Sequence, residues 1–198
     1  SDHAASEAGD TAGRAAAGQV VRQAERIQSL GSWVREMAPF PSMERSPLGA
    51  ADLVAVTQIT AKLVAGVNQG KIRSRIGEIH VGLSKRSPSE YEPALTELGK
   101  LLGADAFKSK SKGRCDSVWL WDNELWLALE AKSDHDPSGV VAHNEVRQAN
   151  DQLRLLASDR GVPQSPVGSA TIIISPKPGI DDDGAKGAEA HVHMVAPP

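Results

Sequence analysis

Two short runs rich in Val, Trp and Leu, separated by residues that favour turns, constrain the fold of this chain more than any other feature. The runs cover residues 114–121 and 125–132, and Asp122-Asn123-Glu124 lies between them. Apolar runs bounded by Asp and Asn are typical of β-strands joined by a turn. The sequence therefore predicts a β-hairpin.

Helical spacing of apolar residues flanks this hairpin on both sides. The spacing predicts helices over residues 19–38, 50–67, 90–102 and 144–157, while 170–175 predicts a buried strand and 191–195 a last edge strand. Asn68-Gln69-Gly70 is expected to end the second helix, and Ser89 to cap the third. An order of helix, strand, strand, helix, strand indicates an α/β fold, with helices on the faces of a mixed sheet.

The length of 198 residues allows one core of ordinary size together with additional segments. We expect a flexible N-terminal tail over residues 1–18, a helical accessory segment over 19–75 and the functional core over 76–198. The accessory helices could cover the core, dimerise it or end a preceding domain, so a homodimer stays open. Because the first residue is Ser1 rather than Met, we expect the chain to be one domain of a longer polypeptide.

Composition excludes several classes of protein. Hydrophobic residues make up 40% and charged residues 24%, which is typical of a soluble globular chain. No apolar run approaches the roughly 20 residues that a membrane-spanning helix needs, so no membrane association is expected. The single cysteine, Cys115, excludes an internal disulfide and a multi-cysteine zinc cluster. A reducing cytoplasm is the expected compartment.

Positive charge is concentrated in one part of the chain. Residues 71–114 contain ten Lys and Arg against five Asp and Glu, although the net charge of the whole chain is -3. The residues Lys108, Lys110, Lys112 and Arg114 form the densest run, directly before Asp116. This run is either a solvated loop or a surface that contacts a polyanion, and its position beside Asp116 favours the second interpretation.

The strand predicted over 125–132 ends in two charged residues. Side chains two positions apart share a face of a strand, so Glu130 and Lys132 are expected to project together. Burying unpaired charge beside an apolar strand is costly, and a bound metal with neighbouring carboxylates would remove that cost. Phosphodiester hydrolysis uses such a set of oxygen ligands and a nearby cation.

Four segments of the chain resemble the successive motifs of PD-(D/E)XK, or restriction-endonuclease-like, nucleases. They read Tyr91-Glu92-Pro93-Ala94-Leu95, Gly113-Arg114-Cys115-Asp116, Leu127-Ala128-Leu129-Glu130-Ala131-Lys132 and Gln148-Ala149-Asn150-Asp151-Gln152-Leu153. The resemblance covers roughly a third of the chain, in the family's order and spacing. One departure is Cys115, which stands where the family usually has proline. An isolated thiol at such a position is more often a small core residue than a nucleophile.

The resemblance implies a role for each matching residue. Asp116 and Glu130 would ligate Mg2+, for which Mn2+ could substitute, and the Ala131 carbonyl would complete the site. Lys132 would orient the attacking water or stabilise the charge of the transition state. Glu92 would be an outer carboxylate and Gln148 would touch metal-bound water or phosphate, although Gln152, one helical turn later, is an alternative to Gln148.

The function implied by the resemblance is that of a Mg2+-dependent endonuclease acting on DNA, within a bacterial restriction or phage-defence complex. One rival is a nuclease-fold module that binds DNA or a protein partner without cutting. A second is an interaction domain whose helices within residues 19–67 assemble a larger complex. The choice between DNA and RNA stays open at this point.

Other residues admit a functional and a structural interpretation. Asp116, Glu130 and Lys132 could instead form a surface salt-bridge cluster. His191 and His193 share a strand face but lack a third ligand, so we expect solvent-facing edge residues rather than a zinc pair. Trp119, Trp121 and Trp126 could stack on bases, although tryptophans in a central hairpin usually lie in the core. The loop 134–139, flanked by His135 and His143, could face the substrate.

The register of the hairpin tests the proposed site. A two-residue turn would oppose Trp121 to Glu124 and leave Asp116 and Glu130 on opposite faces. A three-residue connection, with Trp121 opposite Leu125, would place Asp116 directly across from Glu130. We therefore expect an odd-residue connection, or a bulge near residues 114–116.

Overall fold

The structure is a computed structural model that describes residues 47–65 and 68–197. The described residues from Leu48 onwards belong to one compact unit. The tail expected over residues 1–18 and the helix expected over 19–38 lie outside the described residues. None of the described helices is long and apolar enough to cross a lipid bilayer.

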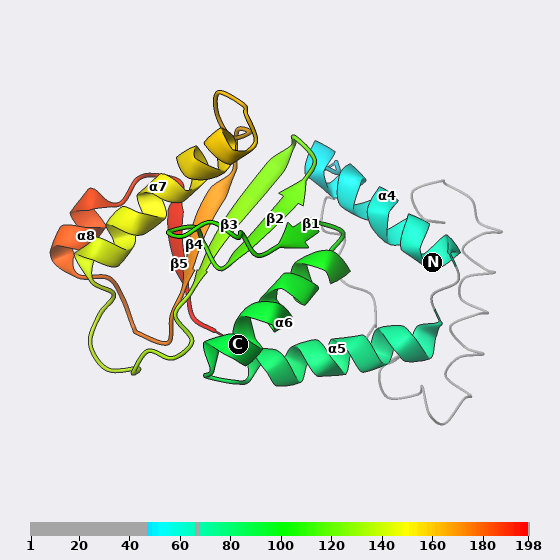
Figure 1. Cartoon of the computed structure of the whole chain (residues 1–198), viewed down its shortest axis with the longest axis horizontal. Helices are drawn as coiled ribbons and strands as arrows, with labels where there is room; N and C mark the ends of the chain where they lie inside the picture. The colour runs from blue at the N-terminus through cyan, green and yellow to red at the C-terminus, as the bar shows by residue number, and fades with distance from the viewer. Residues whose placement is uncertain (1–46, 66–67, 198) are drawn as a thin grey trace, which may run out of the picture. The chain divides into compact units, whose positions relative to one another are not determined.

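A five-stranded mixed sheet forms the centre of the unit (Figure 1). Its order is β1 (Asp105–Phe107), β2 (Ser117–Trp121), β3 (Leu125–Ala131), β4 (Ala170–Ile174) and β5 (Val192–Val195). The first three strands are antiparallel, whereas β3, β4 and β5 run parallel. Parallel neighbours need a crossover connection, which helices supply here. The α/β class and the mixed sheet expected from the sequence are confirmed.

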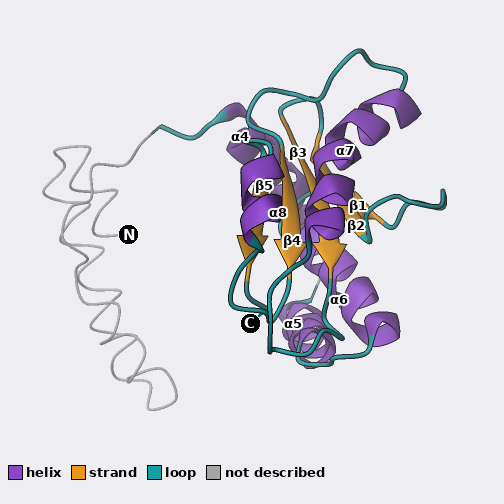
Figure 2. Cartoon of the chain, turned by 90° about the vertical axis from the view of Figure 1, so that its left-hand side faces the viewer, coloured by secondary structure: helices purple, strands orange, loops and turns teal. Residues whose placement is uncertain are grey.

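Helices cover both faces of this sheet, as Figure 1 and, from the side, Figure 2 show. They are α4 (Ala50–Val64), α5 (Gln69–Leu83), α6 (Pro88–Leu101), α7 (His143–Asp159) and α8 (Asp182–Gly187). On one face Tyr91 and Leu95 of α6 pack with Trp119 and Leu129. The other face packs against α7. The sheet is therefore buried on both sides, with a separate apolar layer on each.

The hairpin of β2 and β3 has the register that the site requires. Trp121 pairs with Leu125 and Ser117 pairs with Leu129, so Asp122, Asn123 and Glu124 form a three-residue connection. Asp122 has φ 50, a conformation that Asp tolerates better than most residues. The Asp116 N–H donates to the carbonyl of Leu129 at 2.9 Å, the residue that Ser117 already faces, so two residues of this strand lie opposite one, as in a β-bulge. The predicted odd-residue connection is confirmed, and the ladder becomes irregular at Asp116.

Several element boundaries differ from the expectation. Helix α4 ends at Val64, and Asn68-Gln69-Gly70 begins the next helix rather than ending the previous one: the Asn68 side chain accepts from the Gly70 N–H at 2.6 Å and caps α5. The N-cap of α6 is Ser87 rather than Ser89, because Pro88 occupies the first helical turn. The elements β1 and α8 were also not expected. Helix α5 runs without interruption through residues 75 and 76, where the functional core was expected to begin.

Candidate active site

Glu130 lies on the face of the sheet that α7 covers, and Asp116 approaches it from just before β2. Even-numbered residues of β3, such as Trp126 and Ala128, pack against α7, and Glu130 shares that alternation. The Asp116 side chain reaches the end of β3, where its Oδ2 accepts from the Ala131 N–H at 2.9 Å. The charge of Asp116 acts on the Glu130 carboxyl and raises its pKa, so the two acidic groups are neighbours.

Burial disfavours the ionised form of both carboxyl groups. Glu130 is only 3% exposed. Its pKa is raised to about 7, first by burial and then by the charge of Asp116. The pKa of Asp116 is also raised, chiefly by burial, although the Ala131 N–H opposes this by donating to Asp116 Oδ2 at 2.9 Å. Two interacting acids with raised pKa values form the kind of cluster that structures keep for function.

Lys132 is the nearest cation to Glu130. Its Nζ lies 3.7 Å from Glu130 Oε2, at the outer limit of an ion pair, and about a fifth of the side chain is exposed. The backbone N–H of Lys132 donates to the Ile174 carbonyl at 2.8 Å, so the residue is held at the end of the sheet. The ammonium group is thus placed beside the carboxylates without a close, fixed partner.

The two glutamines of α7 have different partners. Gln148 Nε2 lies 3.4 and 3.5 Å from the two oxygens of Glu130, so Gln148 is the glutamine that faces the carboxylates. Gln152 is 1% exposed. Its Oε1 accepts from the Cys115 N–H at 2.9 Å, while its Nε2 donates to the Gly113 carbonyl at 3.1 Å. Gln152 therefore ties the segment that carries Asp116 to helix α7.

Glu92 lies near the site, but its carboxylate is paired with another residue. It forms an ion pair with Lys108, and its side chain is largely buried. Its charge contributes to the raised pKa of Asp116, after burial. The position expected for an outer carboxylate is therefore close to Asp116, while Lys108 neutralises its charge.

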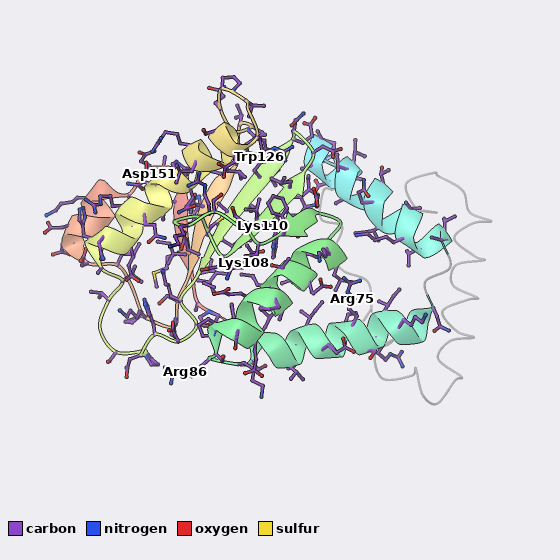
Figure 3. All side chains as sticks on the ribbon, in the orientation of Figure 1. Arg75, Arg86, Lys108, Lys110, Trp126 and Asp151 are labelled. Atoms are coloured by element: carbon purple, nitrogen blue, oxygen red, sulfur yellow. The ribbon has the colours of Figure 1, made fainter. Side chains whose placement is uncertain are left out.

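The four cations expected to contact a polyanion do not behave alike. Lys108 pairs with Glu92, and Arg114 is held by Asp159, whose oxygens accept from Nε at 2.7 Å and from Nη2 at 2.8 Å. Lys110 and Lys112 are exposed and make no ion pair with the rest of the chain as described. Figure 3 labels Lys108 and Lys110 on the segment between β1 and β2. Two of the four positive charges are thus already compensated within the fold.

Cys115 is inert as a nucleophile. It is 3% exposed, and burial raises its pKa to about 12, so the thiol stays protonated. Trp119, Trp121 and Trp126 are at most 8% exposed and lie in the core. The structural interpretation of all four residues is confirmed.

The two histidines at β5 differ in exposure. His193 is exposed, as expected of an edge residue. The expectation was wrong for His191, which is only partly exposed because its Nδ1 lies 3.5 Å from Glu189 Oε2 and its Nε2 is buried. Over residues 47–65 and 68–197, no three His, Cys, Asp or Glu side chains form a group that could hold a metal ion.

No family model, curated protein or solved structure matches this chain. Any function must therefore be argued from the geometry of the site. That geometry consists of the buried Glu130 carboxylate, the partly buried Asp116 carboxylate near it, the Lys132 ammonium 3.7 Å from Glu130 and the Gln148 amide facing Glu130.

The donor set of this site fits a divalent cation with oxygen ligands. Asp116 and Glu130 supply two hard carboxylate oxygens, and their raised pKa values show that nothing in the fold fully compensates their charge. A cation between them would reverse the cost of burial. With only two acidic side chains, the set also needs a further oxygen, a role predicted for the Ala131 carbonyl.

Two features of the site had little or no signal in the sequence. The spacing of Gln148 and Gln152 suggested that both could face the site, but not that Gln152 would bind the backbone of Cys115. The contacts of Arg86 with the loop after β3 span 47 and 49 residues and had no local signal.

Proposed function

We propose that this chain is a Mg2+-dependent nuclease with a restriction-endonuclease-like core, which hydrolyses phosphodiester bonds of DNA. The observation that carries the proposal is that Asp116 reaches the end of β3, where it accepts from the Ala131 N–H beside the buried Glu130, and that both carboxyls have raised pKa values. Lys132 follows on the same face of β3. The resemblance of the same residues to the PD-(D/E)XK motifs supports this assignment. The setting in a bacterial restriction or phage-defence complex rests on the resemblance alone.

Each residue has a role that follows from its position. Asp116 and Glu130 hold the divalent cation, with the Ala131 carbonyl beside them. When bound, Mg2+ would lower the pKa of a water and offset the charge that develops on the phosphoryl oxygens. Lys132 contributes positive charge where the attacked phosphate lies, and Gln148 orients Glu130 through its amide. Glu92 and Lys108 form a neutral pair at the edge of this arrangement.

A purely structural salt-bridge cluster fits these observations less well. Stabilising ion pairs have short contacts that lower the pKa of the acid, whereas Lys132 lies 3.7 Å away and the pKa of Glu130 is raised to about 7. The site therefore costs stability in the absence of a ligand. Buried acids with raised pKa values cluster at functional sites.

The test is a cleavage assay with several substrates and metals. Plasmid, linear duplex, single-stranded DNA and RNA are incubated with the chain in Mg2+, in Mn2+ and in EDTA. We expect cleavage of DNA in Mg2+ or Mn2+ and none in EDTA. Cleavage that persists in EDTA would overturn the metal-dependent mechanism. Preferential cleavage of RNA would correct the substrate.

Metal binding is measured separately, by calorimetry with Mg2+ and Mn2+. Asp116→Asn should abolish the binding, while Asp122→Asn, which removes an exposed carboxylate from the same hairpin, should not. DNA binding without cleavage in any metal would favour a non-cleaving module with the same fold. A chain that binds neither metal nor nucleic acid would refute the proposal.

A further inference from the structure

Two cations from distant parts of the sequence converge on the loop that follows β3. Arg86 lies on the short connection between α5 and α6 (Figure 3), and its Nη2 donates to the His135 carbonyl at 2.7 Å. Lys177 follows β4, and its Nζ donates to the Val140 carbonyl at 3.0 Å. The loop between these two anchor points leads from Lys132 to the start of α7.

Both cations are anchored close to Lys132. Ser133, the next residue, donates from its hydroxyl to the Arg86 carbonyl at 3.1 Å. On the other side, the Lys132 N–H donates to Ile174, three residues before Lys177. The ends of β3 and β4 therefore bring Lys132, Arg86 and Lys177 to one edge of the sheet.

Arg86 and Lys177 differ from the basic residues expected to contact DNA. Lys108 and Arg114 are paired with Glu92 and Asp159, whereas neither Arg86 nor Lys177 has a carboxylate within ion-pair distance in the described part of the chain. Two of the four charges of the predicted basic run are thus compensated, whereas the charges of Arg86 and Lys177 are not paired with a carboxylate of the described residues.

Asp136 feels the charges of both cations, and its own loop satisfies it. Its Oδ1 accepts from the Ser138 N–H at 2.8 Å and from the Ser138 hydroxyl at 2.7 Å. Its pKa is lowered first by these bonds from Ser138 and then by the charges of Arg86 and Lys177. Both cations are therefore near one carboxylate, which leaves a surplus of positive charge at this edge.

We propose that Arg86 and Lys177 form a phosphate-binding subsite that holds the DNA backbone beside the bond cut at Asp116 and Glu130. The inference rests on the proposed nuclease function. Each cation uses one donor on a loop carbonyl and keeps others, because a guanidinium has five N–H donors and an ammonium has three. Arg in particular can bind a phosphate through two parallel hydrogen bonds.

The test compares the salt dependence of DNA binding in matched variants of the full chain. Affinity for a labelled short duplex is measured in EDTA at several salt concentrations, with single-stranded DNA and RNA as parallel probes. Arg86→Gln combined with Lys177→Gln should weaken binding by roughly tenfold per contact at 0.1 M salt, and lower the slope of log affinity against log salt by about 1.8 for duplex DNA. Arg86→Lys combined with Lys177→Arg, which keeps both charges, should retain most of the slope.

The control removes the same two charges elsewhere. Arg154 and Lys186 are more than 70% exposed and pair with acids on their own helices, so Arg154→Gln with Lys186→Gln should leave the slope unchanged. Circular dichroism establishes that each variant is folded. An unchanged slope in the Arg86 and Lys177 variant, or an equal loss in the control, would overturn the subsite while leaving the nuclease proposal intact. If the unsubstituted chain binds no nucleic acid, both proposals fail.

Discussion

The two faces of strand β3 are built from alternating residues of one short segment, yet they do different things. Toward α6 the strand presents Leu125, Leu127, Leu129 and Ala131, all of which belong to or pack against one apolar cluster. Toward α7 it presents Trp126 and Ala128 and then Glu130, which is just as buried but carries a carboxylate. The α6 face of β3 therefore stabilises the fold, whereas the α7 face loses some stability by burying a carboxylate.

Polar groups on the two faces differ in the same way. Toward α6, Ser117 is bonded to Thr96, hydroxyl to hydroxyl, at 2.9 Å and accepts from the Trp119 indole at 3.1 Å. Toward α7, Glu130 has a raised pKa, and the Thr171 hydroxyl has no hydrogen-bond partner among the described residues. Among these residues of β2, β3 and β4, incomplete compensation thus lies on the side of the candidate active site.

The largest expected effect comes from the acidic pair itself. Asp116→Asn keeps the size of the side chain and removes one of two charges that hold the cation. Losing several kcal/mol of charge stabilisation lowers the cleavage rate by roughly a thousandfold. The rate is measured on the preferred DNA substrate in Mg2+, with Asp122→Asn as the control. An Asp116→Asn variant that cuts at the normal rate would remove the functional distinction between the faces.

The next effect is expected on the opposite face. Leu129 is 4% exposed and precedes Glu130 directly. Leu129→Ala should lower the free energy of unfolding by about 2–5 kcal/mol, because it leaves a cavity in the α6 layer. The cleavage rate per folded molecule should change little, since the side chain points away from the site. Urea unfolding and an activity assay on the same sample separate the two quantities. A large loss of activity without a loss of stability would contradict the assignment of stability to the α6 face and of catalysis to the α7 face.

Glu130→Gln tests the cost of the charged face through its pH dependence. The folded-state pKa of about 7 lies above the ordinary 4.5, so the folded chain holds the proton more tightly and wild-type stability falls as pH rises between these values. At about 1.4 kcal/mol per pKa unit, the cost above pH 7 reaches at most about 3–4 kcal/mol. The variant should therefore be more stable than wild type at pH 8 and nearly equal near pH 4.5.

Thermal and urea unfolding at both pH values measure this difference, with Glu124→Gln as an exposed control on the same hairpin. Added Mg2+ should stabilise wild type at pH 8 and have little effect on Glu130→Gln. A wild-type chain whose stability does not fall between pH 4.5 and 8 relative to the variant would refute the cost assigned to Glu130.

The sequence predicted the hairpin face better than the contacts between distant segments. Strand periodicity placed Glu130 and Lys132 together, and the three turn residues gave the hairpin register, although the irregular step at Asp116 was only one of two alternatives considered. Strand β1 was missed because three residues are too few for a period. In α5, Ile72, Ile76 and Ile79 follow a helical spacing, but only Ile79 is buried and charged residues separate them. Contacts such as Arg86 with His135 depend on tertiary packing and have no local pattern.

Gln152→Leu is expected to have a moderate effect on the charged face. The substitution leaves the Cys115 N–H and the Gly113 carbonyl without their partner, which costs about 1–3 kcal/mol of stability. Because these bonds position Asp116, affinity for Mn2+ should also fall by about 10–100-fold. Calorimetry measures that affinity on the folded variant. Gln152→Glu, which keeps the acceptor for Cys115, should retain more of it. Unchanged metal affinity in Gln152→Leu would limit Gln152 to a structural role.

The smallest effect comes from comparing two buried threonine hydroxyls, one with a hydrogen-bond partner and one without. Thr171 is fully buried on the α7 side, and its Oγ1 lacks a hydrogen bond within the described chain. Thr171→Val replaces an unsatisfied polar group by a methyl of similar size, so it should be neutral or stabilise the fold by up to about 1 kcal/mol. Thr96→Val makes the same exchange on the α6 side but breaks the bond to Ser117, and should destabilise by about 1 kcal/mol or more. Urea unfolding of both variants gives the signs directly. Equal destabilisation would mean that a water or other group satisfies Thr171, and that the two faces do not differ in their polar compensation.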